Sequence, residues 1–429
     1  SSLTSEKYAF SCSSTLSSGF TYAVKQVISA TFPMSNSNVL FAPAAKVPCV
    51  ANKNFFNFLL LLAVFLYINI KWKEKKTHGI MKPYKTDEKE KQAMKIRVLS
   101  RDNLAEALDL SSVIEGVEAV YQAKAQGKAV AWPLVEYKFE NGGIMDIRSG
   151  GVFGDVGIHG AKLLNNFPKN AEENLPVFTG ILMAFDSRTG LPIGVMDASY
   201  ITSLRTGAAA AIGAATLAKA DSETLLLVGA GRQAIYLLGA TLLKMPRLRH
   251  VIVADPIDYE NAVHFAETIE NRLKEELGIE TDAVFEATND LKAATGKSDV
   301  ILTITRSTKP LIMREWVKPG THLSCIGADM VGKEEINPEI FRTARAFADD
   351  TVQCCTVGEM EIPAKMGIIS KDSICGEIGQ VLNGQIPGRT SEEDITIFDA
   401  TGLAALDLVT AKVAVKLAEE KNMGTIAEI

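Results

Sequence analysis

The sequence has little of several residue types that mark whole classes of protein. Its six cysteines show no CxxC spacing, and its five histidines show no HxxxH spacing. A disulfide scaffold and a metal site with the usual ligand spacing are therefore not indicated, and we expect reduced thiols and no metal. Positive charge is also in deficit, since 45 lysines and arginines face 51 aspartates and glutamates. The formal net charge of −6 gives no basic field that would favour nucleic acid as a partner.

The rest of the composition is that of a globular protein. Hydrophobic residues make up 47% of the chain, charged residues 22% and aromatic residues 7%. These values argue against a collagen-like, largely disordered or multi-span membrane chain. At about 150 residues per domain, a chain of 429 residues is expected to form two or three domains.

Residues 1–93 do not match the rest of the sequence. Residues 1–54 are rich in serine and poor in acids, as organellar transit peptides are, but lack the expected arginines. Residues 55–70 form an apolar run that is shorter than the about 20 residues of a membrane-spanning helix. Two interpretations stay open: an extension with no part in the chemistry, or a real anchor or targeting segment. We expect a cytoplasmic protein, with an organellar or membrane-anchored location if the extension is retained.

The clearest signal is a strand, turn, helix and strand pattern in residues 223–264. An apolar strand (224–228) leads into the glycine-rich turn GAGRQA (229–234), and an apolar helix follows. A second apolar strand (251–254) then ends at Asp255. The pattern predicts a βαβ unit of the dinucleotide-binding type.

Each residue type in this turn has a physical reason. Gly229 permits the tight turn, Gly231 lets the backbone approach a pyrophosphate, and Ala234 lets the helix pack closely on the strand. The pyrophosphate would lie on the helix N-terminus. Asp255 is placed to accept hydrogen bonds from the adenosine ribose and would repel a 2′-phosphate, which favours NAD over NADP.

Further strands follow at the rhythm of a doubly wound parallel sheet, in residues 299–305, 321–327 and 345–348. Ligands of such sheets bind beyond the carboxyl ends of the strands. Thr305 closes one of these strands, and Asp329 and Lys333 follow another. Asp329 could equally be a capping residue of a loop, and Lys333 a surface lysine.

An alanine-rich helix is predicted in residues 197–219, with Arg205 near its beginning. An arginine among small and apolar residues is costly to bury without an anion, and its planar guanidinium suits a carboxylate. An intramolecular partner for Arg205 remains an alternative. Before this helix, Arg148 and Lys162 stand among residues that read as strands.

At this point the residues are recognisable. The motifs are GAKLLNNFP around Lys162, LRTGAAAA around Arg205, VGAGRQA, GTHLSCIGADMVGKEEI around Asp329, and FDATGLA around Asp399. Together and in this order they resemble the ornithine cyclodeaminase/mu-crystallin family. The resemblance runs from about Met94 to the C-terminus, and residues 1–93 have no counterpart in it.

The resemblance implies an α/β protein with a Rossmann-type doubly wound parallel sheet domain and an α+β substrate and dimerisation domain. Residues 94–206 and 402–429 would form the substrate and dimerisation domain. Residues 207–401 would form the NAD-binding domain. A homodimer is implied, with an amino acid or imine as the small-molecule substrate.

The resemblance also implies roles for individual residues. Asp329 would be the catalytic acid and base, together with Lys162, which holds the substrate head. The substrate would be bound by Arg205, Arg148, Lys162 and Thr401. The residues that line the NAD site would be Gly229, Gly231, Arg232, Gln233, Asp255, Thr305, Ser324, Ile326, Gly327, Lys333 and Arg205.

The expected chemistry begins with removal of a proton from the substrate amine by Asp329 while the α-hydrogen leaves as hydride. The function we expect is that of an ornithine cyclodeaminase, with proline and ammonia as products. The alternative with alanine as substrate is an alanine dehydrogenase, with pyruvate, ammonia and NADH as products. The reverse direction would be a ketimine or pyrroline-2-carboxylate reductase. Arg148 matches the alanine dehydrogenase branch better than the cyclodeaminase branch.

Two departures put the substrate in doubt. A basic motif of the early substrate domain is replaced by Ala131-Trp132-Pro133-Leu134, and Ala400 replaces a hydroxyl residue. A non-enzymatic, crystallin-like dinucleotide-binding protein is a further alternative. Asp255 and Asp329 speak against it, because that branch resembles an NADP binder without an acid at the second position.

Overall fold

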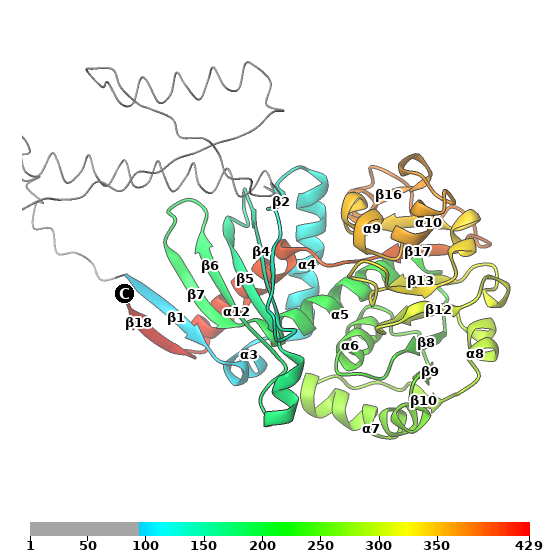
Figure 1. The fold of residues 1–429 in the computed structure, drawn as a ribbon, viewed down its shortest axis with the longest axis horizontal. Coiled ribbons are helices and arrows are strands. Elements are labelled where there is room, and N and C mark those ends of the chain that lie inside the picture. Colours follow the sequence, from blue (N-terminus) through cyan, green and yellow to red (C-terminus); the bar gives the residue numbers. More distant parts are fainter. Residues whose placement is uncertain (1–93) are drawn as a thin grey trace, which may run out of the picture. The chain divides into compact units, whose positions relative to one another are not determined.

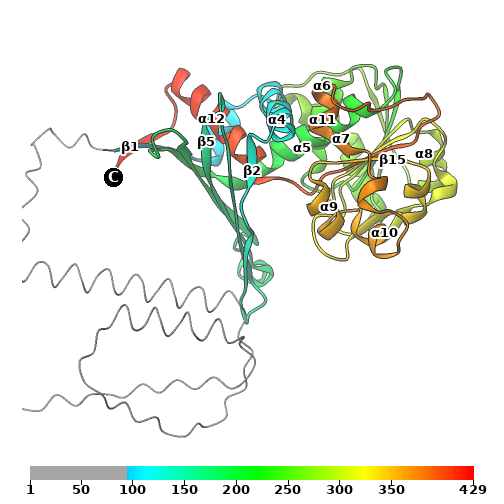
Figure 2. The ribbon, with the colours of Figure 1, turned by 90° about the horizontal axis from the view of Figure 1, so that it is seen from above.

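Two large sheets organise residues 94–429, the part of the chain described by the computed structural model (Figures 1 and 2). Residues 92–429 form one compact unit. The predicted extension 1–93, with the apolar run 55–70, lies outside the described residues. Among the helices of 94–429, none is long and apolar enough to cross a membrane.

The first sheet is mainly antiparallel and has the strand order β18-β1-β7-β6-β5-β4-β2, with β3 paired to β4. Only β1 and β7 run parallel. Its strands are β1 (Lys95–Leu99), β2 (Ala129–Ala131), β3 (Val135–Lys138), β4 (Ile144–Val152), β5 (Ile158–Asn166), β6 (Phe178–Asp186), β7 (Pro192–Asp197) and β18 (Thr425–Glu428).

Helices cover one face of this sheet. They are α3 (Arg101–Ala107), α4 (Leu110–Ala125) and α12 (Ala404–Glu420). Helix α12 packs on β4, β5 and α4. The last helix and strand of the chain therefore return to the sheet in which the described segment begins (Figure 1).

The second sheet is wholly parallel, with the order β10-β9-β8-β11-β13-β17-β15-β16. Its strands are β8 (Thr224–Val228), β9 (His250–Ala254), β10 (Val284–Ala287), β11 (Val300–Thr303), β13 (His322–Cys325), β15 (Arg345–Ala348), β16 (Gly376–Glu377) and β17 (Thr396–Asp399). The order reverses direction between β8 and β11, as in a doubly wound sheet, which confirms the predicted fold class.

The remaining elements surround the parallel sheet. The helices are α6 (Ala234–Lys244), α7 (Tyr259–Leu277), α8 (Leu291–Lys297), α9 (Thr351–Val357), α10 (Glu361–Lys365) and α11 (Ile378–Leu382), and a strand pair joins β12 (Thr308–Ile312) to β14 (Glu334–Ile336). Short 3₁₀ helices are η1 (Pro168–Glu173), which lies between β5 and β6 of the first sheet, and η2 (Arg314–Trp316), η3 (Pro338–Arg342) and η4 (Lys371–Ser373).

Both faces of the parallel sheet are buried. In β8, Leu225 and Leu227 belong to one apolar cluster, and Leu226 and Val228 belong to another on the opposite face. This explains why the strand reads as a continuous apolar run in the sequence. The first cluster continues through α4, α5 and α6, so the two sheets share a core.

Helix α5 (Ala198–Leu217) joins the two sheets. It begins at Asp197, whose carboxylate accepts from the Tyr200 N–H at 2.8 Å. It packs on α6 and β13 on one side and on α4, α12 and β6 on the other. The domain boundary expected between residues 206 and 207 thus falls inside a continuous helix rather than in a linker.

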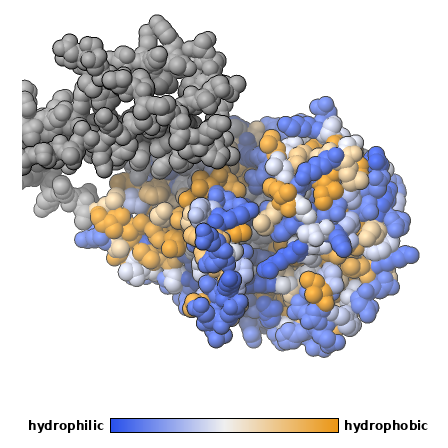
Figure 3. Space-filling view, viewed as in Figure 1, coloured by the Kyte–Doolittle hydropathy of each residue, from blue (hydrophilic) through white to orange (hydrophobic). Residues whose placement is uncertain are grey.

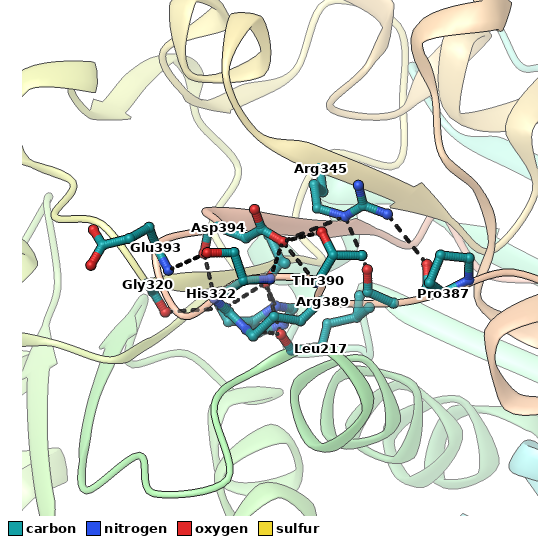
Figure 4. Close-up of polar contacts among 12 residues, drawn as sticks. Leu217, Gly320, His322, Arg345, Pro387, Arg389, Thr390, Glu393 and Asp394 are labelled. Atoms are coloured by element: carbon teal, nitrogen blue, oxygen red, sulfur yellow. Dashed lines mark hydrogen bonds and ion pairs between the residues drawn. The ribbon is translucent and has the colours of Figure 1, made fainter.

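An arginine fixes the C-terminal end of α5 to the parallel sheet (Figure 4). Arg389 Nε donates to the Leu217 carbonyl at 3.0 Å, where a helix leaves its last acceptors free. Its Nη2 donates to the Gly320 carbonyl at 3.1 Å and to Thr396 Oγ1 at 3.2 Å. The helix that carries Arg205 is therefore held at its far end by the strands of the second sheet.

Candidate functional site

Three predicted basic residues gather around one acid that the sequence analysis did not single out. Lys162 on β5 and Arg148 on β4 face each other across the ladder, so their side chains share a face of the sheet. Arg205 comes from α5. Asp407, on α12, bridges Lys162 Nζ at 2.8 Å and Arg205 Nε at 3.1 Å. We call Arg148, Lys162, Arg205 and Asp407 the cation cluster.

The cation cluster is buried except for Arg148, whose side chain is 23% exposed, and it holds more positive than negative charge. The side chains of Lys162 and Asp407 are each 1% exposed, and that of Arg205 is 9% exposed. Arg148 has a second acid beside it, Asp146, at 3.3 Å. Three cations against two carboxylates leave one positive charge without a partner. A buried unpaired charge is costly, so the cluster is suited to receive an anion.

Burial and charge pairing shift the pKa values of Lys162 and Asp407. Burial lowers the pKa of Lys162 to about 8, although the charge of Asp407 opposes the shift. Burial alone would raise the pKa of Asp407, but Arg205 and Lys162 hold it below its ordinary value. Asp407 therefore stays ionised and orients both cations. An acid inside the apolar helical run AALDLVTAK is the signal that could have identified it.

The cluster lies at the carboxyl end of β17. The guanidinium of Arg205 packs against Gly402, where a Cβ atom would lie 2.4 Å from Arg205 Nη1. Thr401, predicted to lie near the substrate, is thus adjacent to the cluster. Its Oγ1 accepts from Gln353 Nε2 at 2.9 Å and donates to Asp349 at 3.3 Å, so the hydroxyl is engaged within the protein.

The glycine-rich turn stands along the same edge of the parallel sheet, where the strand order reverses. Gly229 has a φ of +104°, and a Cβ there would lie 2.8 Å from the Ile304 carbonyl. Gly231 is exposed, and no described atom lies within 4 Å of where its Cβ would be. The backbone at Gly231 is therefore open to a ligand, and Gln233 leads from it directly into α6. Arg232 lies over the Phe178 ring of β6, 5.9 Å from its centroid.

Asp255 lies next to this turn. Its carboxylate accepts from the Ala230 N–H at 3.3 Å and from Asn261 at 2.8 Å. Burial would raise the pKa of Asp255, but bonds from Ile257, Asn261 and other donors lower it, so the group is ionised. An open glycine turn, a helix N-terminus and an anchored acid at the second strand fit the shape and chemistry of a dinucleotide.

Asp329 and Lys333 form a separate pair on the loop after β13. Lys333 Nζ donates to Asp329 Oδ1 at 2.5 Å and to the Gly327 carbonyl at 3.2 Å. The Asp329 side chain is 42% exposed, so the carboxylate is open to solvent. Within the described residues these hydrogen bonds link the pair to its own loop and not to the cation cluster.

Comparison with known proteins decides the family. Residues 94–422 match the model of the Ornithine cyclodeaminase/mu-crystallin family. The chain belongs to this family. The resemblance inferred from the motifs is thereby confirmed, and residues 1–93 lie outside the match.

Members of the ornithine cyclodeaminase/mu-crystallin family with different activities are similar to this chain. Alanine dehydrogenase of Archaeoglobus fulgidus is 34% identical over 332 residues, which are 77% of this chain and 98% of that protein. An archaeal alanine dehydrogenase dimer with bound NAD has a TM-score of 0.71 and 33% identity, covering 78% of this chain and all of the other. Thermococcus litoralis Δ1-pyrroline-2-carboxylate reductase, with NADH and L-proline, has a TM-score of 0.68 and 29% identity, covering 77% and 99%.

One residue that the family resemblance placed on the cofactor does not face open space. The Ser324 side chain is fully buried, and its Oγ donates to the Ala210 carbonyl of α5 at 3.2 Å and bonds His322 Nε2 at 2.9 Å. It serves the packing of α5 on β13. Ile326, predicted beside it, is only 6% exposed. The predicted strand 321–327 contains β13, and the fold turns the Ser324 side chain toward α5.

Cysteines and histidines do not assemble into a metal site in the described part of this family member. Within residues 94–429, no group of three or more histidine, cysteine, aspartate or glutamate side chains could hold a metal ion. Cys325, Cys354, Cys355 and Cys375 are free thiols. The cysteines at 12 and 49 lie outside the described residues.

Proposed function

We propose that this chain is an NAD(H)-dependent enzyme that acts at the Cα of a 2-amino or 2-imino acid, as a dehydrogenase or imine reductase. The observation that carries the proposal is the surplus positive charge of the cation cluster. One uncompensated charge matches one carboxylate, and a guanidinium beside a lysine can hold it in a fixed orientation. The activities of similar relatives, alanine dehydrogenase and pyrroline-2-carboxylate reductase, support this choice.

The residues of the parallel sheet fit NAD as the cofactor. Gly229 and Gly231 would cradle the pyrophosphate, and Asp255 would hold the ribose hydroxyls. Thr305, Gly327 and further residues of the strand ends would line the nicotinamide half. Bound NAD would accept the hydride from the substrate Cα or return it to an imine.

The other steps belong to side chains of this chain. Arg148, Lys162 and Arg205 would fix the substrate carboxylate and so aim the Cα–H bond, which is catalysis by positioning. Asp329 would take the proton from the substrate amine or return it, and its exposure gives it access. Lys333, bonded to that carboxylate, would hold it in place on the loop.

One observation favours a second candidate, an ornithine cyclodeaminase. Asp146 Oδ1 is buried without a hydrogen-bond partner among the described residues. It lies beside Arg148 on the face of β4 that carries the cation cluster. A free carboxylate oxygen there could accept the side-chain ammonium group of a diamino acid, which would give proline and ammonia from ornithine.

The test compares three reactions of the full chain. NADH formation from L-alanine and NAD, or NADH oxidation with Δ1-pyrroline-2-carboxylate, supports the proposed dehydrogenase or reductase. Ammonia and proline from ornithine without NADH accumulation would replace it with the cyclodeaminase. NADH binding without turnover of any substrate would indicate a crystallin-like binding protein.

Replacement of Asp329 by alanine checks the proposed acid and base. We expect turnover to fall by at least about 10²-fold, while NADH still binds with wild-type affinity. Asp372→Ala, at an exposed acid in η4, is the matched control and should leave turnover unchanged. Full activity of Asp329→Ala would remove this residue from the chemistry.

We also propose a homodimer formed through the open face of the first sheet. Neighbouring strands present a row of apolar side chains there: Ile181, Leu163, Ile147 and Val135, which are paired in register. Ile181 is 55% exposed and Val135 is 53% exposed. Hydrophobic residues gather over β1, β6 and β7 in the surface view (Figure 3).

This face is opposite to the one that bears Lys162 and Arg148, since successive residues of a strand alternate. A continuous apolar sheet face on one copy is complementary to the same face on a second copy. The dimeric state of the archaeal alanine dehydrogenase supports a dimer of this chain.

A further inference from the structure

A buried glutamate ties together the loops that follow β11 and β13. Glu335, on β14, has no solvent exposure. Its Oε2 accepts from Thr303 Oγ1 at 2.6 Å and from the Gly327 N–H at 2.8 Å. Its Oε1 accepts from the Thr305 N–H at 2.6 Å and from Thr305 Oγ1 at 2.8 Å. Each carboxylate oxygen thus receives one backbone N–H, each from a different loop.

These bonds explain why the two strands end earlier than the sequence predicted. β11 ends at Thr303 and β13 at Cys325, although apolar residues continue beyond both. Thr305 and Gly327 direct their N–H groups to Glu335 instead of to a neighbouring strand. One carboxylate therefore sets the spacing between two loops that are predicted to line the cofactor.

The contact between Gly327 and Glu335 requires a residue without a side chain. A Cβ at this position would lie 2.5 Å from Glu335 Oε1 and 2.4 Å from the Thr305 carbonyl. Such distances are far below van der Waals contact, so only glycine lets the loop approach the carboxylate. The Gly327 carbonyl also accepts a hydrogen bond from Lys333 Nζ, and Lys333 in turn pairs with Asp329.

A second buried acid, Glu359, lies beside Glu335. Glu359 accepts from the Glu335 N–H at 2.9 Å and from the Ile336 N–H at 2.7 Å, both through Oε1. Burial, and then the charge of Glu335, raise the pKa of Glu359 well above its ordinary value. Burial raises the pKa of Glu335 as well, but the four donors directed at its two oxygens oppose that shift. Glu359 therefore carries the proton, and Glu335 carries the negative charge.

We propose that Glu335 is a positioning residue for the dinucleotide: through Thr305 and Gly327 it holds the ends of β11 and β13 in the geometry that the cofactor requires. The inference rests on the proposed NAD(H) function. Glu335 itself is buried and acts only through the loops that follow β11 and β13.

The direct test is Glu335→Gln, because an amide has one acceptor oxygen. In either orientation, its NH₂ group faces the N–H of Thr305 or of Gly327, and one loop must move. We expect the Kd for NADH, measured by fluorescence titration well below the unfolding temperature, to rise about tenfold or more. Glu359→Gln is the matched control: its amide imitates the protonated acid, and the Kd should stay within about twofold of wild type.

Thermal unfolding separates the proposal from a general structural role. Glu335→Gln should bind NADH more weakly at temperatures where thermal unfolding shows that it is folded, whereas Glu359→Gln should keep both its melting temperature and its affinity. A folded Glu335→Gln protein that binds NADH as tightly as wild type would overturn the inference. If wild type itself does not bind NADH, the proposed function fails instead.

If Glu335→Gln does not fold, the Thr303→Val variant tests the positioning role of Glu335 instead. Thr303 is fully buried and donates to Glu335, so its loss loosens the carboxylate without removing any group that could reach the cofactor. We expect a Kd for NADH raised about two- to fivefold. An unchanged Kd in this variant would also overturn the inference.

Discussion

Single residues of the candidate site depend on charges contributed by distant parts of the chain. Lys162 and Arg205 are basic groups in apolar surroundings, which are costly to bury alone. Asp407 joins them from a helix that lies 202 residues beyond Arg205 in sequence. The stability of the Lys162 and Arg205 pair, and the carboxylate binding proposed for it, therefore depend on Asp407.

Replacing Asp407 by asparagine should lower the free energy of unfolding by about 3–5 kcal/mol. The reason is that Lys162 and Arg205 would remain buried without a counter-charge. Chemical denaturation of the full chain measures the change. Glu280→Gln is the control, because it breaks an ion pair with Lys274 that is exposed on both sides, and its effect should not be measurable. Equal effects of the two substitutions would contradict the role given to Asp407.

The pKa of Lys162 predicts a pH dependence. The lysine is charged below pH about 8 and loses its charge as the pH rises through that value. Its ability to hold a carboxylate is thus present below pH 8 and lost above it. We expect kcat/KM for the carboxylate substrate to fall about tenfold per pH unit above this point. Lys162→Arg stays charged, so in a folded variant kcat/KM should no longer fall above pH 8. A wild-type kcat/KM that stays constant through pH about 9.5 would exclude Lys162 from carboxylate binding.

At the scale of elements, α5 is the component that positions the site. It carries Arg205 near its beginning and is held by Arg389 at its end. Small residues let it approach α6: a Cβ on Gly207 would lie 2.3 Å from the Tyr236 carbonyl. Backbone cannot move aside as a flexible side chain can, so this approach fixes the distance between the helices.

Gly207→Ala should therefore separate α5 from α6 and lower the free energy of unfolding by about 1–3 kcal/mol. The matched control is Gly296→Ala in α8, where the nearest atom to a new Cβ is the Trp316 carbonyl at 3.8 Å. There the gain in helix propensity should stabilise the protein by about 0.4–1 kcal/mol. Thermal or chemical unfolding of both variants checks the pair, and a neutral Gly207→Ala would show that the helices can shift.

At the scale of the whole molecule, the open apolar face of the first sheet determines the expected assembly. Its residues alternate with those that face the helices, so the cation cluster and the proposed dimer interface lie on opposite faces. Dimerisation would then support the sheet from outside without covering Lys162 or Arg148.

Ile181→Lys should convert the dimer to a monomer, because a charged group would be buried between two copies of the sheet. Val284→Lys is the control: Val284 is 63% exposed on β10, at the edge of the other sheet, and should leave the dimer intact. Sedimentation or light scattering measures the mass of each variant. A dimeric Ile181→Lys protein would place the interface elsewhere.

The sequence alone determined the parallel sheet and the family, because both depend on local patterns. The apolar run 224–228 and the segment 345–348 coincide with β8 and β15, and the glycine turn stands where its spacing predicted. Gly229 needs a positive φ, a requirement that any glycine-rich turn of this type expresses locally.

Only the tertiary structure decided which charges meet. Asp407 and Glu335 are not assigned from the sequence because their partners lie in other segments, and the strand pattern alone does not show that the Ser324 side chain turns toward α5. Long-range contacts of this kind depend on how α5 and α12 pack between the sheets, and packing follows from the shape of the whole core. The sequence thus predicts the elements and their motifs, while the pairing of buried charges is settled by the fold.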